Sequence, residues 1–352
     1  MTISIANAAR ERNEQLIATA EARELRLPSK YLLQMAHLTA PATVAKYVEP
    51  ACTKSAANLV ILDLEDSIPR NNDALLVTAR DTIVRAVNEL DWGQRLRFFR
   101  PRGLRLDPGH SDIIDIVSRA GAKLDGLVYP KVESAAEVVS IDQTLTALEA
   151  KLGLPTGRIR VEVLIESANA EEQVFEIARS SKRLVGLIFG AFDYWGSLRI
   201  VGERYRTDHP LVNHARCRIV KAAASVGLPA IAEMTLNYPT RNKSEDEQKA
   251  ALHECLKDAE YARAYGFRGK WTGIPAQTQI AIDVFSLPDA VIQEAIVAAT
   301  AFLEAEREGR GATIIDGKMN DRATDRIHRV ALETALALGR LDAATAKELG
   351  LA

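Results

Sequence analysis

Eight short apolar segments, each followed by a stretch with helical periodicity, constrain the fold of this chain more than any other feature of the sequence. They recur at intervals of roughly 25 to 45 residues, and two of them, 59–62 and 186–189, are uninterrupted apolar runs, as parallel strands buried on both faces require. The predicted strands are 31–37, 58–64, 96–100, 126–130, 161–165, 186–190, 230–235 and 269–274. Eight consecutive strand–helix units predict an α/β fold that closes into a (β/α)8 TIM barrel.

The length of the chain agrees with one barrel and two additions. Of the 352 residues, a barrel of this kind takes about 250. We expect the barrel to cover 31–286. Residues 1–30 are predicted to form an N-terminal helical extension, in which 8–25 is charged and rich in Ala. Residues 287–352 contain two further helical stretches around a Gly-rich turn, which predicts a C-terminal helical tail or lid outside the barrel.

Charge and cysteine content argue against several classes of protein. The 45 basic and 47 acidic residues are mixed along the chain, with a net charge of −2, so no field favours a nucleic acid. The three cysteines are isolated and lack CxxC spacing, which argues against a disulfide framework or structural zinc. No apolar run reaches the roughly 18 residues of a membrane span, and no signal-peptide pattern is present. We expect a cytoplasmic protein without membrane or nucleic-acid partners.

Charged residues are concentrated where the predicted strands end. In a β/α barrel the catalytic groups lie at the carboxyl ends of the strands, so these residues are the first candidates for function. The charged residues at these positions are Asp63, Glu65, Asp66, Arg100, Arg102, Lys131, Glu133, Glu166 and Asp193. The mouth of the barrel is therefore predicted to be rich in carboxylates, with a few cations among them.

Two of these acids are candidate metal ligands. Crowded carboxylates repel one another, and either raised pKa values or a hard cation with oxygen ligands relieves the repulsion. Glu166 and Asp193 end adjacent predicted strands, so their carboxylates could reach one Mg²⁺, or Mn²⁺ in its place, and leave positions open for substrate oxygens. The alternative is that both acids cap the helices that follow them.

The cations at the mouth are candidates for substrate contacts. Arg100 is predicted to project into the mouth, where it could hold a carboxylate or steady a developing enolate, with a salt bridge to Glu65 or Asp66 as the alternative. Arg102 is an equally good candidate for a substrate contact and for a solvated loop residue. Lys131 is assigned to substrate binding, because the surrounding acids should keep its amine protonated and so disfavour a nucleophilic role.

Other kinds of active site lack support in the sequence. No pair among the six histidines has metal-ligand spacing, and no G-x-S-x-G motif is present. The Gly-rich turn at 309–311 does not follow a strand in the way that a nucleotide-binding motif requires.

Five ordered motifs at the strand ends and in the tail resemble one known family. They match the citrate-lyase β-subunit-like and malyl-CoA lyase family of the HpcH/HpaI aldolase superfamily, in register from about 31 to 338. The motifs are Leu-Asp-Leu-Glu-Asp-Ser at 62–67, Tyr-Pro-Lys-Val-Glu at 129–133, Leu-Ile-Glu-Ser-Ala at 164–168, Phe-Gly-Ala-Phe-Asp at 189–193 and Ile-Asp-Gly-Lys-Met at 315–319. Together the five are a specific signal, although each is weak alone.

The resemblance implies a role for several residues. Family members bind magnesium through the acids matching Glu166 and Asp193, and the metal chelates a 2-oxoacid such as glyoxylate. The arginine matching Arg100 contacts substrate and stabilises the enolate, and the acids matching Glu65 and Asp66 lie near the water shell of the metal.

The resemblance also gives the tail a function. In malyl-CoA lyase relatives, the aspartate matching Asp316 enters the active site of an adjacent subunit as an acid/base group. The C-terminal region 287–352 is therefore expected to contribute to a neighbouring subunit's active site, in a homotrimer or a hexamer.

The expected activity is that of a Mg²⁺-dependent carbon–carbon lyase. It would cleave or form a 3-hydroxyacyl-CoA thioester of the malyl-CoA, β-methylmalyl-CoA, citramalyl-CoA or citryl type, with an acyl-CoA and a 2-oxoacid as the two halves. Two departures affect the pocket: Arg-Pro-Arg at 100–102 replaces Arg-Val-Asn, and Ala-Phe-Asp at 191–193 replaces Gly-Ala-Asp or Pro-Ala-Asp. Two alternatives stay open, namely a metal-dependent aldolase of free hydroxy-oxo acids and a non-catalytic subunit that binds CoA esters.

Overall fold

The strands form a closed barrel of eight parallel strands in chain order. The computed structural model describes residue 10 and residues 13–15, 27–69 and 72–351. Each strand pairs with the next, and the last pairs with the first. The strands are β1 (Ala36–Pro41), β2 (Leu59–Asp63), β3 (Leu96–Arg100), β4 (Gly126–Tyr129), β5 (Arg160–Ile165), β6 (Leu184–Phe189), β7 (Ala230–Ala232) and β8 (Gly269–Thr272). The predicted (β/α)8 TIM barrel is confirmed.

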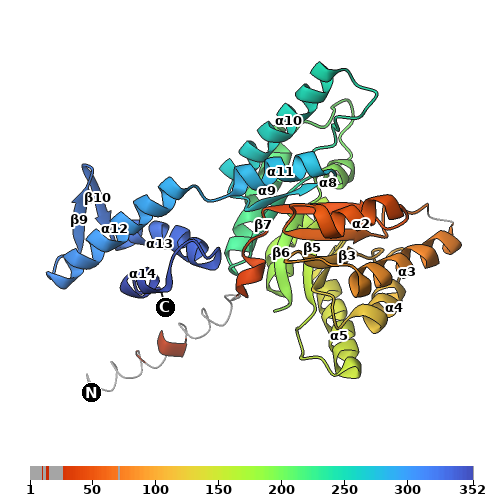
Figure 1. Ribbon diagram of the computed structural model, residues 1–352, viewed down its shortest axis with the longest axis horizontal. Helices are drawn as coiled ribbons and strands as arrows, with labels where there is room; N and C mark the ends of the chain where they lie inside the picture. The colour runs from red at the N-terminus through yellow and green to blue at the C-terminus, as the bar shows by residue number, and fades with distance from the viewer. Residues whose placement is uncertain (1–9, 11–12, 16–26, 70–71, 352) are drawn as a thin grey trace. The chain divides into compact units, whose positions relative to one another are not determined.

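Helices follow the strands and cover the outside of the barrel (Figure 1). Polar side chains fix where two of them begin: Asn72 accepts a hydrogen bond from the N–H of Leu75, and Ser244 and Glu247 form a reciprocal capping box. The helices are α2 (Ala45–Lys54), α3 (Asp73–Glu89), α4 (Ser111–Ala120), α5 (Ala135–Leu152), α6 (Ala168–Glu172), α7 (Val174–Arg179), α8 (Ala191–Ser197), α9 (Pro210–Ala224), α10 (Glu245–Ala264) and α11 (Pro275–Phe285).

The first predicted strand was placed too early. Instead of 31–37, the strand is Ala36–Pro41, and Ser29–Tyr31 form a short 3-10 helix, η1. The error has a physical cause, because β1 carries polar residues on the side that faces into the barrel and is less apolar than the segment before it. The predicted helix at 8–25 falls outside the described residues, apart from residues 10 and 13–15.

The side chains that point into the barrel are unusually polar. Residues that face the helices, such as Val60 and Val163, belong to one continuous apolar core, whereas several alternate positions carry buried ionisable groups. In one of these pairs, Nε2 of His37 lies 3.0 Å from Oε2 of Glu162, and both side chains are fully buried. Gly186 leaves room for the pair, since a Cβ there would lie 2.8 Å from Oε1 of Glu162. The interior therefore differs from the branched apolar layers that usually fill such barrels.

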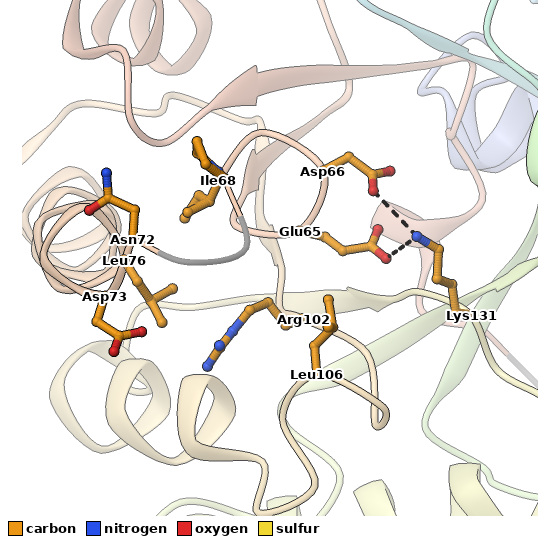
Figure 2. Close-up of a pocket in the computed structure, with 10 residues that line it drawn as sticks. Glu65, Asp66, Ile68, Asn72, Asp73, Leu76, Arg102, Leu106 and Lys131 are labelled. Carbon is orange, nitrogen blue, oxygen red and sulfur yellow. Dashed lines mark hydrogen bonds and ion pairs between the residues drawn. The ribbon is translucent and has the colours of Figure 1, made fainter.

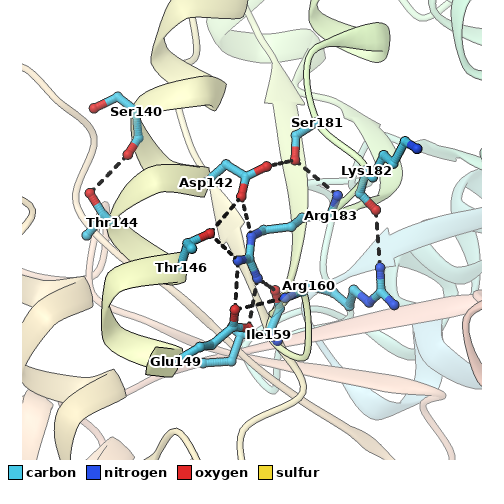
Figure 3. A network of polar contacts seen from close by, with 11 residues as sticks. Ser140, Asp142, Thr144, Thr146, Glu149, Ile159, Arg160, Ser181, Lys182 and Arg183 are labelled. Atoms are coloured by element: carbon cyan, nitrogen blue, oxygen red, sulfur yellow. Dashed lines mark hydrogen bonds and ion pairs between the residues drawn. The ribbon is translucent and has the colours of Figure 1, made fainter. Parts of the chain in front are cut away.

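A network centred on Arg183 lies just before the amino end of β6 (Figure 3). Its guanidinium donates to Asp142 Oδ1 at 2.5 Å, to Glu149 Oε2 at 2.7 Å and to Thr146 Oγ1 at 2.7 Å, all on α5. Glu149 also accepts the N–H groups of residues 157 and 159 at 2.8 and 2.7 Å. These bonds join α5 to the segments that enter β5 and β6, on the side of the barrel away from its mouth.

The chain divides into two compact units, and the second consists of Pro28–Leu33 and Ser286–Ala352. Its own core is built from small and aliphatic residues such as Ile292, Ala299 and Leu332. Its elements are α12 (Asp289–Arg307), β9 (Ala312–Ile315), β10 (Lys318–Asp321), α13 (Arg322–Ala337) and α14 (Ala343–Glu348). The strands β9 and β10 form an antiparallel hairpin. Within the described part of the chain, no helix is long and apolar enough to cross a membrane.

Candidate active site

Arg100 is fixed at the mouth of the barrel by ion pairs and an aromatic ring. It ends β3, where the strand register places it beside Asp63 at the end of β2. Its Nε donates to Asp63 Oδ1 at 2.6 Å, and its Nη1 lies 2.9 Å from Glu65 Oε2 and 3.5 Å from Asp66 Oδ2. Its Cζ lies 5.1 Å from the ring centroid of Trp271. The salt bridges considered for Arg100 are present, and they leave the guanidinium rigid and buried.

The sequence places Asp63 among the charged residues of the mouth but predicts no specific role for it, and none for Trp271. Burial alone would raise the pKa of Asp63, but Arg100 outweighs burial, and the pKa lies below its usual value. The N–H groups of Glu65 and Ser67 also donate to its carboxylate, at 3.1 and 3.2 Å. The indole N–H of Trp271 donates to Thr39 on β1. The position of Asp63 at the end of the strand next to that of Arg100 is the sequence signal that could predict their ion pair. The contact of Arg100 with Trp271 has no such signal, because it forms only when the last strand closes the barrel.

Lys131 contacts the acids of the mouth with both its side chain and its main chain. Nζ lies 2.7 Å from Glu65 Oε1 and 3.3 Å from Asp66 Oδ1 (Figure 2). Its backbone N–H donates to Glu166 Oε1 at 2.6 Å. Burial lowers the pKa of Lys131, but Glu65, Asp66 and Asp193 raise it more, so that the net shift is upward. The amine therefore stays protonated and is a cation at this site, not a nucleophile.

Glu166 is the most perturbed carboxyl group of the mouth. It follows β5 and is 5 % exposed. Burial raises its pKa, the charges of Glu65 and Asp193 raise it further, and Arg100 and the N–H of Lys131 offset only part of the shift. The pKa therefore lies well above the usual value for glutamate. Burial and the nearby charge of Asp66 likewise raise the pKa of Glu65, against the opposing charges of Arg100 and Lys131.

Asp193 lies in the first turn of α8 and is exposed. Its charge acts on both Glu166 and Lys131, which places the three groups close together. The two acids do not serve as N-caps. The side chain of Ser167, not Glu166, accepts the N–H of Ala170 at the start of α6, and Gly190 is the N-cap of α8.

The donors at the mouth suit a divalent cation that shares its coordination with substrate. Among the described residues, no group of three or more His, Cys, Asp or Glu side chains forms a complete metal site. Glu166 and Asp193 could still supply two oxygens to Mg²⁺, which commonly keeps waters or substrate oxygens in its remaining positions. The raised pKa of Glu166 supports this fit, because a cation would lower the cost of ionising a buried acid among other acids.

A pocket of about 310 Å³ opens beside the charged residues (Figure 2). Glu65, Asp66 and Lys131 form one part of its wall, and the rest is lined by Ile68, Pro69, Asn72, Asp73, Leu76, Arg102 and Leu106. The pocket therefore joins a charged end to a partly apolar one. A ligand with a polar reactive end and a longer, less polar arm would fit this combination.

Arg102 lies on the wall of the pocket and is held by Asp112. Its Nε and backbone N–H donate to Asp112 Oδ2 at 2.9 and 3.0 Å. Asp112 is fully buried and also accepts a hydrogen bond from Arg80 Nε at 2.8 Å. Arg102 is therefore a constrained residue, which could present part of its guanidinium to a ligand.

Asp316 belongs to the second unit. It occupies the turn between β9 and β10 with a φ of 48°, and Gly317 follows with a φ of 76°. Its side chain is exposed. The barrel thus brings together Glu65, Asp66, Arg100, Lys131, Glu166 and Asp193, with Arg102 on the wall of the adjoining pocket, whereas the expected role of Asp316 across a subunit boundary stays a prediction.

Residues 40–273 match the family described as HpcH/HpaI aldolase/citrate lyase. The chain is 34% identical, over 284 residues, to an L-malyl-CoA/beta-methylmalyl-CoA lyase of Cereibacter sphaeroides, covering 77% of this chain and 85% of the relative. It is 30% identical, over 310 residues, to a (3S)-malyl-CoA thioesterase of the same species, covering 86% of this chain and 96% of the relative.

Solved structures share the fold. One is the protein CitE from Mycobacterium tuberculosis in complex with magnesium, acetoacetate and coenzyme A. It superposes with a TM-score of 0.60 at 24% sequence identity, covering 85% of this chain and 97% of the other.

Proposed function

The chain belongs to the HpcH/HpaI aldolase/citrate lyase family, and we propose that it is a magnesium-dependent lyase that cleaves or forms a 3-hydroxyacyl-CoA thioester, with an acyl-CoA and a 2-oxoacid as the two halves. The observation that carries this proposal is the buried Glu166 with its raised pKa, next to Asp193 and the rigid Arg100. An acid that ionises poorly by itself suits a site that is completed by a cation.

Glu166 and Asp193 would hold the cation, with Mg²⁺ as the first choice and Mn²⁺ as a substitute. When bound, the cation would act as a Lewis acid and polarise substrate oxygens. Glu65 and Asp66, which both contact Lys131, would accept hydrogen bonds from water molecules around the cation. The solved relative that is described with magnesium and coenzyme A supports this assignment.

Arg100 would stabilise the negative charge that develops on the thioester oxygen. In the cleavage direction, the C2–C3 bond breaks, the 3-hydroxyl loses its proton and becomes the oxo group, and C2 takes a proton. The electron pair of the broken bond is held as a thioester enolate, and a prepositioned guanidinium needs little reorganisation to bind it. The ion pairs with Asp63 and Glu65 and the ring of Trp271 give Arg100 this fixed position.

Asp316 from a neighbouring subunit would move the proton. Its exposed place at the tip of a hairpin supports this role, since a tip with Ile314 and Met319 also exposed can insert into another copy of the chain. A homotrimer, or a hexamer of paired trimers, is the assembly that we propose. The acyl-CoA arm would occupy the pocket beside Lys131, with Arg102 on its wall as a further contact.

Product identity tests the proposal against its alternatives. The purified protein is incubated with Mg²⁺ and a panel of 3-hydroxyacyl-CoA esters, and products are identified by mass spectrometry. We expect an acyl-CoA and a 2-oxoacid, and no turnover after EDTA treatment. Free CoA with an intact hydroxy acid would instead indicate a thioesterase, the activity named for one relative. Cleavage of free hydroxy-oxo acids alone would indicate an aldolase, and calorimetric binding without turnover would indicate a non-catalytic subunit.

A further inference from the structure

We propose that Lys131 is a positioning residue with two separable roles: its backbone N–H orients Glu166 for the metal, and its ammonium group holds Glu65 and Asp66. This inference rests on the proposed function, because it concerns how the carboxylates are arranged around the cation. Three observations on Lys131 support it: a positive φ, a short hydrogen bond from its backbone N–H, and two ion contacts of its side chain.

The main-chain role follows from the backbone conformation. Lys131 has a φ of 51°, in the left-handed region that residues with a Cβ rarely adopt. In this conformation its N–H lies 2.6 Å from Glu166 Oε1, and within the described part of the chain it is the only hydrogen-bond donor to that carboxylate. The bond therefore selects one orientation of Glu166 and leaves Oε2 for another partner.

Gly190 limits Glu166 from the other side. A Cβ at position 190 would lie 2.5 Å from the Cβ of Glu166 and 2.7 Å from its Oε2. Contacts this short cannot be accommodated without movement, and the Cβ of Glu166 is fixed by the strand that precedes it. Two backbone segments, after β4 and after β6, thus enclose the side chain of Glu166.

The side chain of Lys131 contacts two acids of the mouth. Nζ contacts Glu65 at 2.7 Å and Asp66 at 3.3 Å, and Figure 2 shows both carboxylates directed at the ammonium group. Glycine would adopt the same φ with little strain but could not bind these acids. A lysine here therefore combines a glycine-like backbone with a cation that contacts both Glu65 and Asp66.

Substitutions at this position separate the two roles. Lys131→Gly keeps the N–H and tolerates the φ, so we expect the calorimetric Kd for Mg²⁺ to stay within threefold of the wild-type value while kcat/KM falls at least tenfold. Lys131→Pro removes the N–H and imposes a negative φ, and Gly190→Ala crowds Glu166 from the opposite side; each should raise the Kd at least tenfold. Arg199→Gly is the matched control, because Arg199 is an exposed residue with a φ of 52° on another loop, and it should leave Mg²⁺ binding unchanged.

A metal-free measurement decides the main-chain contact independently. Pro130–Lys131 is the only Pro-Lys sequence in the chain, so carbonyl-¹³C proline and ¹⁵N lysine labelling gives one correlation, from the Lys131 amide. We expect a downfield amide proton that moves upfield in Glu166→Ala, which removes the acceptor oxygen, in the absence of any cation. An unmoved resonance, or wild-type Mg²⁺ affinity in both Lys131→Pro and Gly190→Ala, would overturn the main-chain role.

A tenfold weaker Mg²⁺ affinity in Lys131→Gly would overturn the separation of the two roles. Failure of the wild-type protein to bind Mg²⁺ would count against the proposed function and leave the amide shift to decide the contact.

Discussion

The network around Arg183 and the charged residues at the mouth of the barrel use the same residue types in opposite ways. Around Arg183, the acidic side chains have hydrogen-bond donors close by. The guanidinium donates to Asp142, Thr146 and Glu149, and two backbone N–H groups also donate to Glu149. Burial opposes ionisation of Asp142 and Glu149, but hydrogen bonds from Arg183 and its neighbours more than compensate, so both pKa values lie below the usual range. The charges in this network satisfy one another.

At the mouth, carboxylates exceed the cations that could neutralise them. Arg100 satisfies Asp63, whose pKa is lowered, whereas Glu65 and Glu166 have raised pKa values because burial and neighbouring acids outweigh the cations. Removing one member of a complete buried network leaves an uncompensated charge and is costly, whereas an incomplete network is available to a ligand that supplies the missing charge. The contrast indicates where function lies without reference to any relative.

Glu166→Gln should produce the largest effect on activity. The amide is uncharged and is a weaker ligand for Mg²⁺ than a carboxylate, so we expect turnover to fall on the order of 10³-fold. The free energy of unfolding of the metal-free protein should stay the same or rise, because a buried acid among acids is removed. Steady-state kinetics and urea unfolding measure the two quantities. A fall in the free energy of unfolding as large as the one expected below for Arg183→Met would contradict the distinction between the two networks.

Arg183→Met should affect stability instead. It leaves Glu149 and Asp142 buried or half-buried without their cation, and we expect the free energy of unfolding to fall by about 3–5 kcal/mol. The fraction that remains folded should bind Mg²⁺ with the wild-type Kd. Lys182→Met, at the exposed neighbouring residue, serves as the control and should change stability by less than about 0.5 kcal/mol. A change in Mg²⁺ affinity would show that the networks are coupled.

Arg100→Lys should have an intermediate effect. A lysine keeps the charge but cannot contact Asp63 and Glu65 through two fixed nitrogens while its charged group lies over the ring of Trp271. We expect kcat/KM to fall about 100-fold, which corresponds to about 2.7 kcal/mol of transition-state stabilisation. Initial rates with the best CoA ester measure it. Wild-type kinetics would mean that the rigid guanidinium is dispensable.

The smallest predicted effect is a difference in pH dependence. The folded pKa values of Asp142 and Glu149 are lowered, so their contribution to stability is present above the unfolded values near 3.8 and 4.5 and is lost as the pH falls below them. The folded pKa of Glu166 is raised, so in the metal-free protein it costs stability as the pH rises above about 4.5. Thermal unfolding from pH 4 to pH 8 should show a decline for the wild-type protein that is smaller in Glu166→Gln. Parallel curves for the two proteins would contradict the raised pKa.

Periodicity was sufficient to predict the barrel, because apolar runs at regular spacing have few other ways to bury both faces. It misplaced β1, where polar residues that point into the barrel, His37 and Thr39, interrupt the apolar pattern. The acids of the mouth could be predicted because residues that follow parallel strands all lie at the same end of a barrel. The ring of Trp271 against Arg100 and the left-handed backbone of Lys131 could not be predicted, because both depend on how distant segments meet in space.

The buried pair of His37 and Glu162 makes each half of the barrel chemically incomplete. His37 comes from β1 and Glu162 from β5, and neither side chain reaches water once the strands close. A fragment that ends after β4 would contain the imidazole without its carboxyl partner, and the remaining half would bury Glu162 without the imidazole. The two halves are therefore expected to depend on each other for stability, so that duplication or exchange of a half-barrel would succeed only if this cross-barrel partner came with it.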